Sequence, residues 1–185
     1  MPTFIFSNDY SALEKRVYMR AARVACQILQ ADKYDASIEI IRGNLGRTGR
    51  AAIASMGLGY YRLITDIRLE PHEVVHSLGH ELIHFHQFAR GDMAEQPNRI
   101  IWKGNSFQLA ELDCDGMMAY LNQPWEQEAF AKQDELFKAV ARELPMADRE
   151  ALSREYEEIR GGGLRKLIEA MFGRTIDIEV HRRSA

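Results

Sequence analysis

The sequence has little cysteine, no long apolar run and no excess of positive charge. Its two cysteines, Cys26 and Cys114, form no disulfide framework, as is usual for proteins of a reducing compartment. The N-terminus lacks a basic start followed by an apolar core, and no run of about 18 apolar residues occurs, so we expect neither a secretory signal nor a membrane span. The formal net charge of -3 argues against a general basic field for nucleic acid. We therefore expect a cytoplasmic protein with no membrane partner and no nucleic-acid partner.

The composition predicts one compact domain over residues 1–185. Of these residues, 46% are hydrophobic and 28% are charged, which provides enough apolar side chain to bury a core. Hydrophobic periodicity and turn residues predict an α+β fold with a small mixed sheet. The expected elements are helices over 11–31, 71–89, 109–121, 124–144, 148–160 and 164–172, strands over 37–41, 60–69 and 175–180, and a polar loop over 92–109.

Residues 71–88, PHEVVHSLGHELIHFHQF, contain the HExxH motif twice. The copies are His72–His76 and His80–His84. Because residues four apart lie on the same face of a helix, the two histidines of one copy can bind one metal ion. The glutamate between them lies about 100° round the helix, where it can hold a metal-bound water and act as a general base. This arrangement predicts zinc-dependent hydrolysis of a peptide bond.

The second copy of the motif is the better candidate for a metal site. A proline at the first helical position places His72 in the first turn, which is usually exposed. His80 and His84 lie in the middle of the helix, where neighbouring elements can surround an ion. We therefore predict His80 and His84 as metal ligands and Glu81 as the general base, and we interpret His72 and His76 as solvated or supporting histidines.

A catalytic zinc needs a third protein ligand and one open position. Three downstream glutamates are candidates: Glu111, Glu126 and Glu128. The last two lie in the first turn of a predicted helix, where a glutamate also stabilises the helix dipole without any other role. Ala129, three residues after Glu126, is small enough to let that helix pack against the motif helix, although Ala131 stands in the same relation to Glu128. We predict Glu126 as the third ligand and keep the other two as alternatives.

Two strings of the sequence carry a family resemblance. HELIHFHQ at 80–87, followed by YLNQPWEQEA at 120–129, resembles zincin metallopeptidases, in particular the gluzincin pattern of HExxH with a later ExxA helix, as in the ImmA/IrrE type. The strings also look like small zincin-like proteins encoded by phages and prophages. The segment GRTGRA at 46–51, before a strand, is similar to SprT-like (Spartan-type) proteases. Where those proteins have a third-ligand histidine this chain has Lys103, which cannot bind zinc as a cation.

The resemblance implies a zincin-like fold, with an edge strand near 60–69 beside the active-site helix and a C-terminal helical part. It also implies Zn2+ as the cofactor and a protein or peptide as the substrate. Tyr120 matches a family tyrosine and would hydrogen-bond the oxyanion, unless it is a buried structural tyrosine. The alternative function is a non-catalytic protein that keeps the zincin scaffold as a phage structural, assembly or partner-binding component. The expected setting is a bacterial or phage-infected cell, or the virion, with a phage or host protein as partner.

Overall fold

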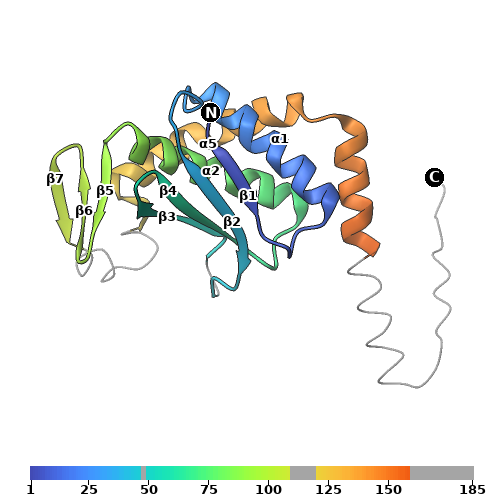
Figure 1. The fold of residues 1–185 in the computed structure, drawn as a ribbon, viewed down its shortest axis with the longest axis horizontal. Helices are drawn as coiled ribbons and strands as arrows, with labels where there is room; N and C mark the ends of the chain where they lie inside the picture. Colours follow the sequence, from blue (N-terminus) through green and yellow to red (C-terminus); the bar gives the residue numbers. More distant parts are fainter. Residues whose placement is uncertain (47–48, 109–119, 159–185) are drawn as a thin grey trace, which may run out of the picture.

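The computed structural model describes residues 1–46, 49–108 and 120–158 (Figure 1). They form an α+β fold with two small sheets and a layer of helices. The elements are β1 (Thr3–Phe6), α1 (Ala12–Ile28), β2 (Ser37–Gly43), β3 (Ala51–Gly57), β4 (Tyr60–Asp66), α2 (Pro71–Ala89), β5 (Met93–Gln96), β6 (Arg99–Trp102), β7 (Asn105–Gln108) and α5 (Pro124–Glu143), with further helical residues at 146–158.

The larger sheet is mixed and has the strand order β1-β2-β4-β3. β1, β2 and β4 are parallel, and β3 is antiparallel to β4. Side chains alternate across the strands, so that Ile38, Ile40 and Leu63 are fully buried on one face while Glu39 and Arg62 pair on the other at 2.7 Å. The helices cover only the first of these faces (Figure 1), which explains why the buried apolar side chains of the four strands all lie on it.

The motif helix α2 is the central element of this helical layer. It begins at Pro71 and ends at Ala89, as the sequence predicts, and a capping box between Glu70 and Glu73 closes its start. It contacts α1, α5, β3, β4 and β5, so that most of its circumference is covered. Leu82 and Phe85 are fully buried within this contact. The helix is therefore a rigid base for the polar side chains that it buries in its middle.

Gly79, in the middle of α2, has room for the methyl group of an alanine. A Cβ atom built there meets only the Leu136 Cδ2 atom of α5, at 3.7 Å, which is an ordinary van der Waals distance. Because glycine in a helix costs roughly 0.5–1 kcal/mol relative to alanine, we expect Gly79→Ala to raise the free energy of unfolding by about that amount. Urea denaturation measures it. A loss of stability instead would show that α2 and α5 cannot accept even one methyl group between them.

The polar loop predicted over 92–109 is wrong, because β5, β6 and β7 form an antiparallel sheet there. Its strands have only four residues each, too few for a clear alternation of polar and apolar residues. Lys103 and Gly104 form the two-residue connection of β6 and β7 with φ angles of 48° and 83°, which is the backbone of a tight hairpin turn. Lysine is an unusual first residue for that turn, so the sequence carries a weak signal.

The predicted edge strand near 60–69 is also wrong in its place. β4 covers Tyr60–Asp66 but lies inside the sheet, between β2 and β3, and the edge strand beside α2 is β3, with β1 at the opposite edge. β3 has the sequence AAIASMG, whose single β-branched residue, Ile53, makes a poor strand signal. β1 is a second strand that the sequence reading did not predict. The N-terminal residues therefore belong to the sheet.

The remaining helices agree with the sequence wherever the structure describes them. α1 has the predicted capping box of Ser11 and Glu14, and α5 begins at Pro124 and ends before Pro145. Helical residues at 146–158 match most of the predicted helix 148–160. The predictions over 109–121, 164–172 and 175–180 lie wholly or largely outside the described residues, and the single-domain prediction for 1–185 stays a prediction.

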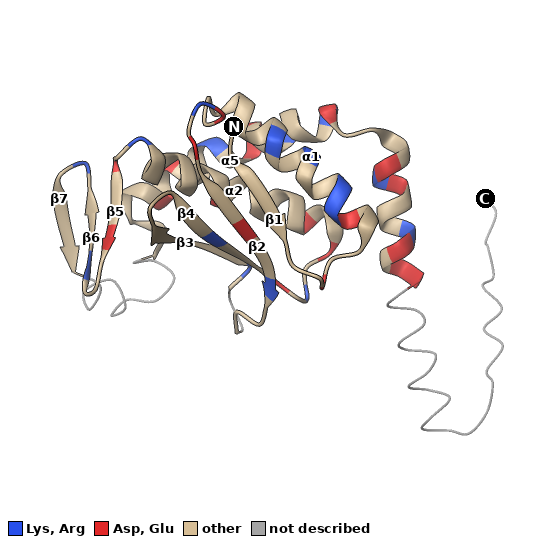
Figure 2. Ribbon diagram, in the orientation of Figure 1, with Lys and Arg blue, Asp and Glu red and all other residues tan. Residues whose placement is uncertain are grey.

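Charged side chains are mixed in sign over the fold. Figure 2 shows lysine and arginine interspersed with aspartate and glutamate along the helices and strands. Within the described ranges, no helix combines the length and the apolar character that crossing a bilayer requires.

Candidate metal centre

His80, His84 and Glu126 come together between α2 and α5. The Nε2 atoms of the two histidines are 3.1 Å apart, and the Glu126 carboxylate lies 3.1 Å from His80 Nε2 and 3.2 Å from His84 Nε2. Zinc at about 2.0–2.1 Å from each of three tetrahedral ligands would separate the ligands by about 3.3 Å. The three donor groups are therefore spaced almost as such an ion requires. They are the only group of this kind in the part of the chain that the structure describes.

The three buried side chains need a shared proton or a metal ion among them. Their exposed fractions are 8% for His80, 6% for His84 and 5% for Glu126. Two imidazole nitrogens that face each other at 3.1 Å repel unless a proton or a metal ion lies between their lone pairs, and a buried carboxylate also needs a positive partner. The buried group of His80, His84 and Glu126 can bind a metal ion.

Helical spacing explains how two distant segments build the group. His80 and His84 are one turn apart on α2, and Glu126 lies in the first turn of α5. Ala129, fully buried one turn after Glu126, lets α5 approach α2. The second sheet holds the start of α5, because the rings of Trp102 and Phe107 lie 6.3 and 5.4 Å from that of Trp125. The packing of Ala129 and of Trp125, on either side of Glu126 in the sequence, thus places this predicted ligand beside the histidines.

Glu81 lies buried next to the group of His80, His84 and Glu126 and faces the edge strand β3. Its carboxylate accepts a hydrogen bond from the backbone N–H of Ile53 in β3. Burial raises the pKa of Glu81, although the nearby His84 and His80 and the Ile53 N–H act in the opposite direction. A carboxylate with a raised pKa beside a metal site has the chemistry of a general base.

Tyr120 also reaches the group. Its hydroxyl hydrogen-bonds the Glu126 carboxylate, and its ring meets that of Phe130 edge-on at 6.3 Å. Burial of the hydroxyl and the negative charge of Glu126 raise the pKa of Tyr120, which therefore stays a neutral donor. The residue as a whole is 39% exposed, so it is not the buried structural tyrosine of the alternative interpretation.

Glu128, the alternative third ligand, points away from the histidines. Arg90 donates to both of its carboxylate oxygens at 2.7 and 2.8 Å, Lys132 pairs with it at 2.5 Å and Lys103 lies 3.5 Å away. These contacts outweigh burial and hold the pKa of Glu128 at about 2. Residues two positions apart in a helix lie about 200° apart around its axis, so Glu126 and Glu128 cannot face the same ion. Glu111, the other alternative, lies outside the described residues.

Among the described residues, the first HExxH copy forms no comparable group. His72 is 70% exposed and lies 3.7 Å from Glu70, while His76 lies 3.5 Å from Asp134 and packs its ring against Phe137. Neither histidine belongs to the buried cluster of possible ligands. This placement agrees with their interpretation as solvated or supporting residues.

Without a metal ion, the centre is expected to hold a proton on His84. Burial opposes that proton, but the hydrogen bond to Glu126 and the charges of Glu81 and Glu126 outweigh burial and raise the pKa of His84 from 6.5 to about 9. Hydrogen bonds from His80 and His84 likewise lower the pKa of Glu126 to about 2, against the effect of burial. We therefore expect the imidazole of His84 in metal-free protein to stay protonated at pH 7.5 and to titrate near pH 9 in 15N NMR.

The stability of the metal-free protein should follow the same two groups. The His84 contribution is complete below pH 6.5 and is lost as the pH rises through 9, because the folded pKa is the higher one. The Glu126 contribution is complete above pH 4.5 and is lost as the pH falls through 2.

Glu126→Gln should return the His84 pKa toward or below 6.5. A His84 resonance that titrates near 6.5 in the unchanged protein would contradict this account.

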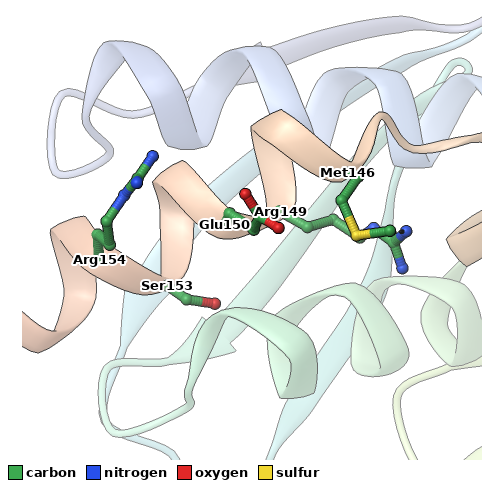
Figure 3. Close-up of a pocket in the computed structure, with 5 residues that line it drawn as sticks. All are labelled: Met146, Arg149, Glu150, Ser153 and Arg154. Carbon is green, nitrogen blue, oxygen red and sulfur yellow. Dashed lines mark hydrogen bonds between the residues drawn. The ribbon is translucent and has the colours of Figure 1, made fainter.

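A surface hollow on the last described helix is unrelated to the metal group. It is lined by Met146, Arg149, Glu150, Ser153 and Arg154, and its volume is about 400 Å³ (Figure 3). All five residues come from the helical residues 146–158, and none belongs to α2 or α5. This hollow contributes nothing to the candidate metal site.

Three polar residues near the centre were absent from the sequence predictions. Gln87 and Gln133 hydrogen-bond the two histidines, and Glu95 of β5 accepts the Ser55 N–H of β3. The position of Gln87, three residues after His84, is a signal that helical spacing could have provided. Gln133 and Glu95 depend on how α5 and β5 pack, which no local pattern encodes.

Comparison with known proteins leaves the chemistry of this centre to be argued from its own geometry. No protein-family model, no curated protein and no solved structure matches the chain.

Proposed function

We propose that this protein is a zinc-dependent metallopeptidase with a zincin-like fold. The observation that carries the proposal is the buried triangle of His80, His84 and Glu126 with Glu81 beside it on the same helix. Two imidazole nitrogens and one carboxylate oxygen are a donor set that zinc accepts, and three protein ligands leave its fourth position open for catalysis. The HExxH motif with a downstream glutamate is the pattern of gluzincins, which supports peptide hydrolysis over other zinc chemistry.

Each residue has a role in the proposed reaction. A bound zinc ion would supply Lewis acidity that activates water and polarises the scissile carbonyl. Glu81 accepts a proton from the attacking water and delivers it to the leaving amine nitrogen. Tyr120, whose one hydroxyl hydrogen goes to Glu126 in the free protein, would turn that hydrogen to the oxyanion when substrate binds. A substrate strand placed along the edge strand β3 would pass Glu81, because the Ile53 N–H already contacts that carboxylate.

A second candidate function is a structural metal site without catalysis. It is favoured by the burial of all four residues, each less than 9% exposed, which leaves little of the centre open in the described part of the chain. In that case the metal ion would fasten α2 to α5, and the protein would act as a structural, assembly or partner-binding component.

Removal and return of the metal ion test the proposal. The full chain is incubated with a fluorogenic peptide library before and after treatment with 1,10-phenanthroline, and then with one equivalent of zinc. We expect cleavage that chelation abolishes and zinc restores. If the protein binds one zinc ion per chain and cleaves nothing, the structural candidate holds. Cleavage that is indifferent to the chelator would show a different catalytic site.

A further inference from the structure

Two glutamines contact the imidazoles of the candidate metal centre at their Nδ1 atoms, on the side away from Glu126. Gln87 Oε1 lies 2.8 Å from His84 Nδ1, and Gln133 Oε1 lies 2.9 Å from His80 Nδ1. Each histidine thus meets a side-chain amide through the nitrogen that points away from the centre. Gln87 is fully buried and follows His84 by one helical turn, while Gln133 follows Glu126 by two turns on α5.

The contacts of Gln87 determine which nitrogen of His84 carries the proton. The Gln87 amide nitrogen donates to the backbone carbonyl of Trp125 at 3.0 Å, so its oxygen is the atom that faces His84. An amide oxygen only accepts, and therefore His84 Nδ1 carries a hydrogen. The neutral imidazole is then bare at Nε2, the nitrogen that faces His80 and Glu126. Gln87 thus orients His84 as a ligand.

The same amide joins the two halves of the centre. Trp125, whose carbonyl it binds, immediately precedes Glu126 in the first turn of α5. A single fully buried side chain therefore holds one histidine of α2 and the backbone next to the carboxylate of α5. Both ends of this amide are hydrogen-bonded, so it is buried without the cost of an unpaired polar group.

The charge of the two glutamine side chains affects the candidate metal site as well as their position does. Ligand histidines commonly donate to a carboxylate or a backbone carbonyl, and a carboxylate makes the imidazole more basic. The two amides here are neutral. A divalent ion bound with Glu126 would keep one net positive charge, whereas two carboxylates in place of the glutamines would add two negative charges beside Glu81 and Glu126.

We propose that Gln87 and Gln133 are positioning residues that hold His80 and His84 as neutral, Nε2-directed ligands and keep the bound ion electron-poor. This inference rests on the metal site of the proposed function and deepens it. It predicts that the affinity for metal responds to the chemistry of the side chain at 133, and not only to its volume.

Zinc affinity of the full chain, measured by competition with a chromophoric chelator, tests the inference. Gln133→Met keeps length but removes the acceptor, and we expect it to weaken zinc binding by roughly 10–100-fold. Gln133→Glu restores an acceptor and makes His80 more basic, so we expect binding as tight as in the unchanged protein or tighter. Gln127→Met is the matched control, because Gln127 is exposed on the same helix and should leave affinity unchanged. Gln87→Met repeats the test at His84.

The visible spectrum of bound Co2+ provides a second measurement, since rotation of a ligand ring changes the ligand field. We expect Gln133→Met to alter this spectrum and Gln133→Glu to retain its tetrahedral bands. Zinc binding by Gln133→Met and Gln87→Met that is within threefold of the unchanged protein would overturn the inference, as would equal weakening by Met and Glu at 133. Failure of the metal site itself is distinct, because His80→Ala would then leave the metal content of the protein unchanged.

Discussion

Replacement of Glu81 by glutamine is expected to lower the rate of peptide hydrolysis by roughly 10²–10⁴-fold, the usual contribution of a general base. Glutamine has nearly the same shape and can still accept the Ile53 N–H, but it cannot take a proton from water. Glu81 is not one of the three gathered donor groups, so the zinc content should stay at one ion per chain. The rate constant for a cleaved fluorogenic peptide and metal analysis of the same sample measure the two quantities.

The matched control for this change is Glu73→Gln. Glu73 is the equivalent glutamate of the first HExxH copy, but it caps α2 and pairs with Arg50 instead of facing a metal group. The control should lower neither activity nor zinc content. Full activity of Glu81→Gln would sink the proposed role of Glu81, and loss of zinc in that variant would mean that Glu81 is itself a ligand.

Replacement of Glu126 by alanine is expected to weaken zinc binding by more than roughly 100-fold, the upper end of what loss of an outer hydrogen-bond partner costs. The change removes a donor 3.1–3.2 Å from both histidine nitrogens. Glu128→Ala, two residues further along the same helix, should leave affinity nearly unchanged because its carboxylate is bound by Arg90 and Lys132. Titration with a competing chelator measures both variants.

The comparison of three variants can refute the third ligand. Full zinc binding by Glu126→Ala, together with loss of zinc in Glu111→Ala, would move the ligand to Glu111. Loss of zinc only in Glu128→Ala would contradict the packing of α5, because Glu126 and Glu128 face different directions.

The elements that carry the histidines and Glu126 were predictable because their signals are local. A proline at the first position and a helical repeat define α2, and proline at both ends defines α5. The choice of the second HExxH copy followed from its place in the middle of the helix, where burial is expected. These signals act over a few residues, which is the range over which sequence patterns are reliable.

The placement of Glu126 beside the histidines and the place of the edge strand β3 depend on contacts between distant residues. Glu126 and Glu128 have equally good local patterns, and only the packing of Trp125 on the second sheet and of Ala129 on α2 turns one of them toward the histidines. β3 lies at an edge because the chain reverses between Gly57 and Tyr60 and, among the described strands of its sheet, β3 pairs only with β4, although AAIASMG has little strand character. Tertiary packing overrode weak local preference in both cases.

The central claim is that a divalent metal ion is bound by His80, His84 and Glu126. Crystals of the full chain grown with zinc and measured on both sides of the zinc absorption edge test it directly. The account predicts one anomalous peak about 2.0–2.1 Å from the Nε2 atoms of both histidines and a similar distance from the Glu126 carboxylate. A peak at His72 and His76, or none between α2 and α5, would contradict it.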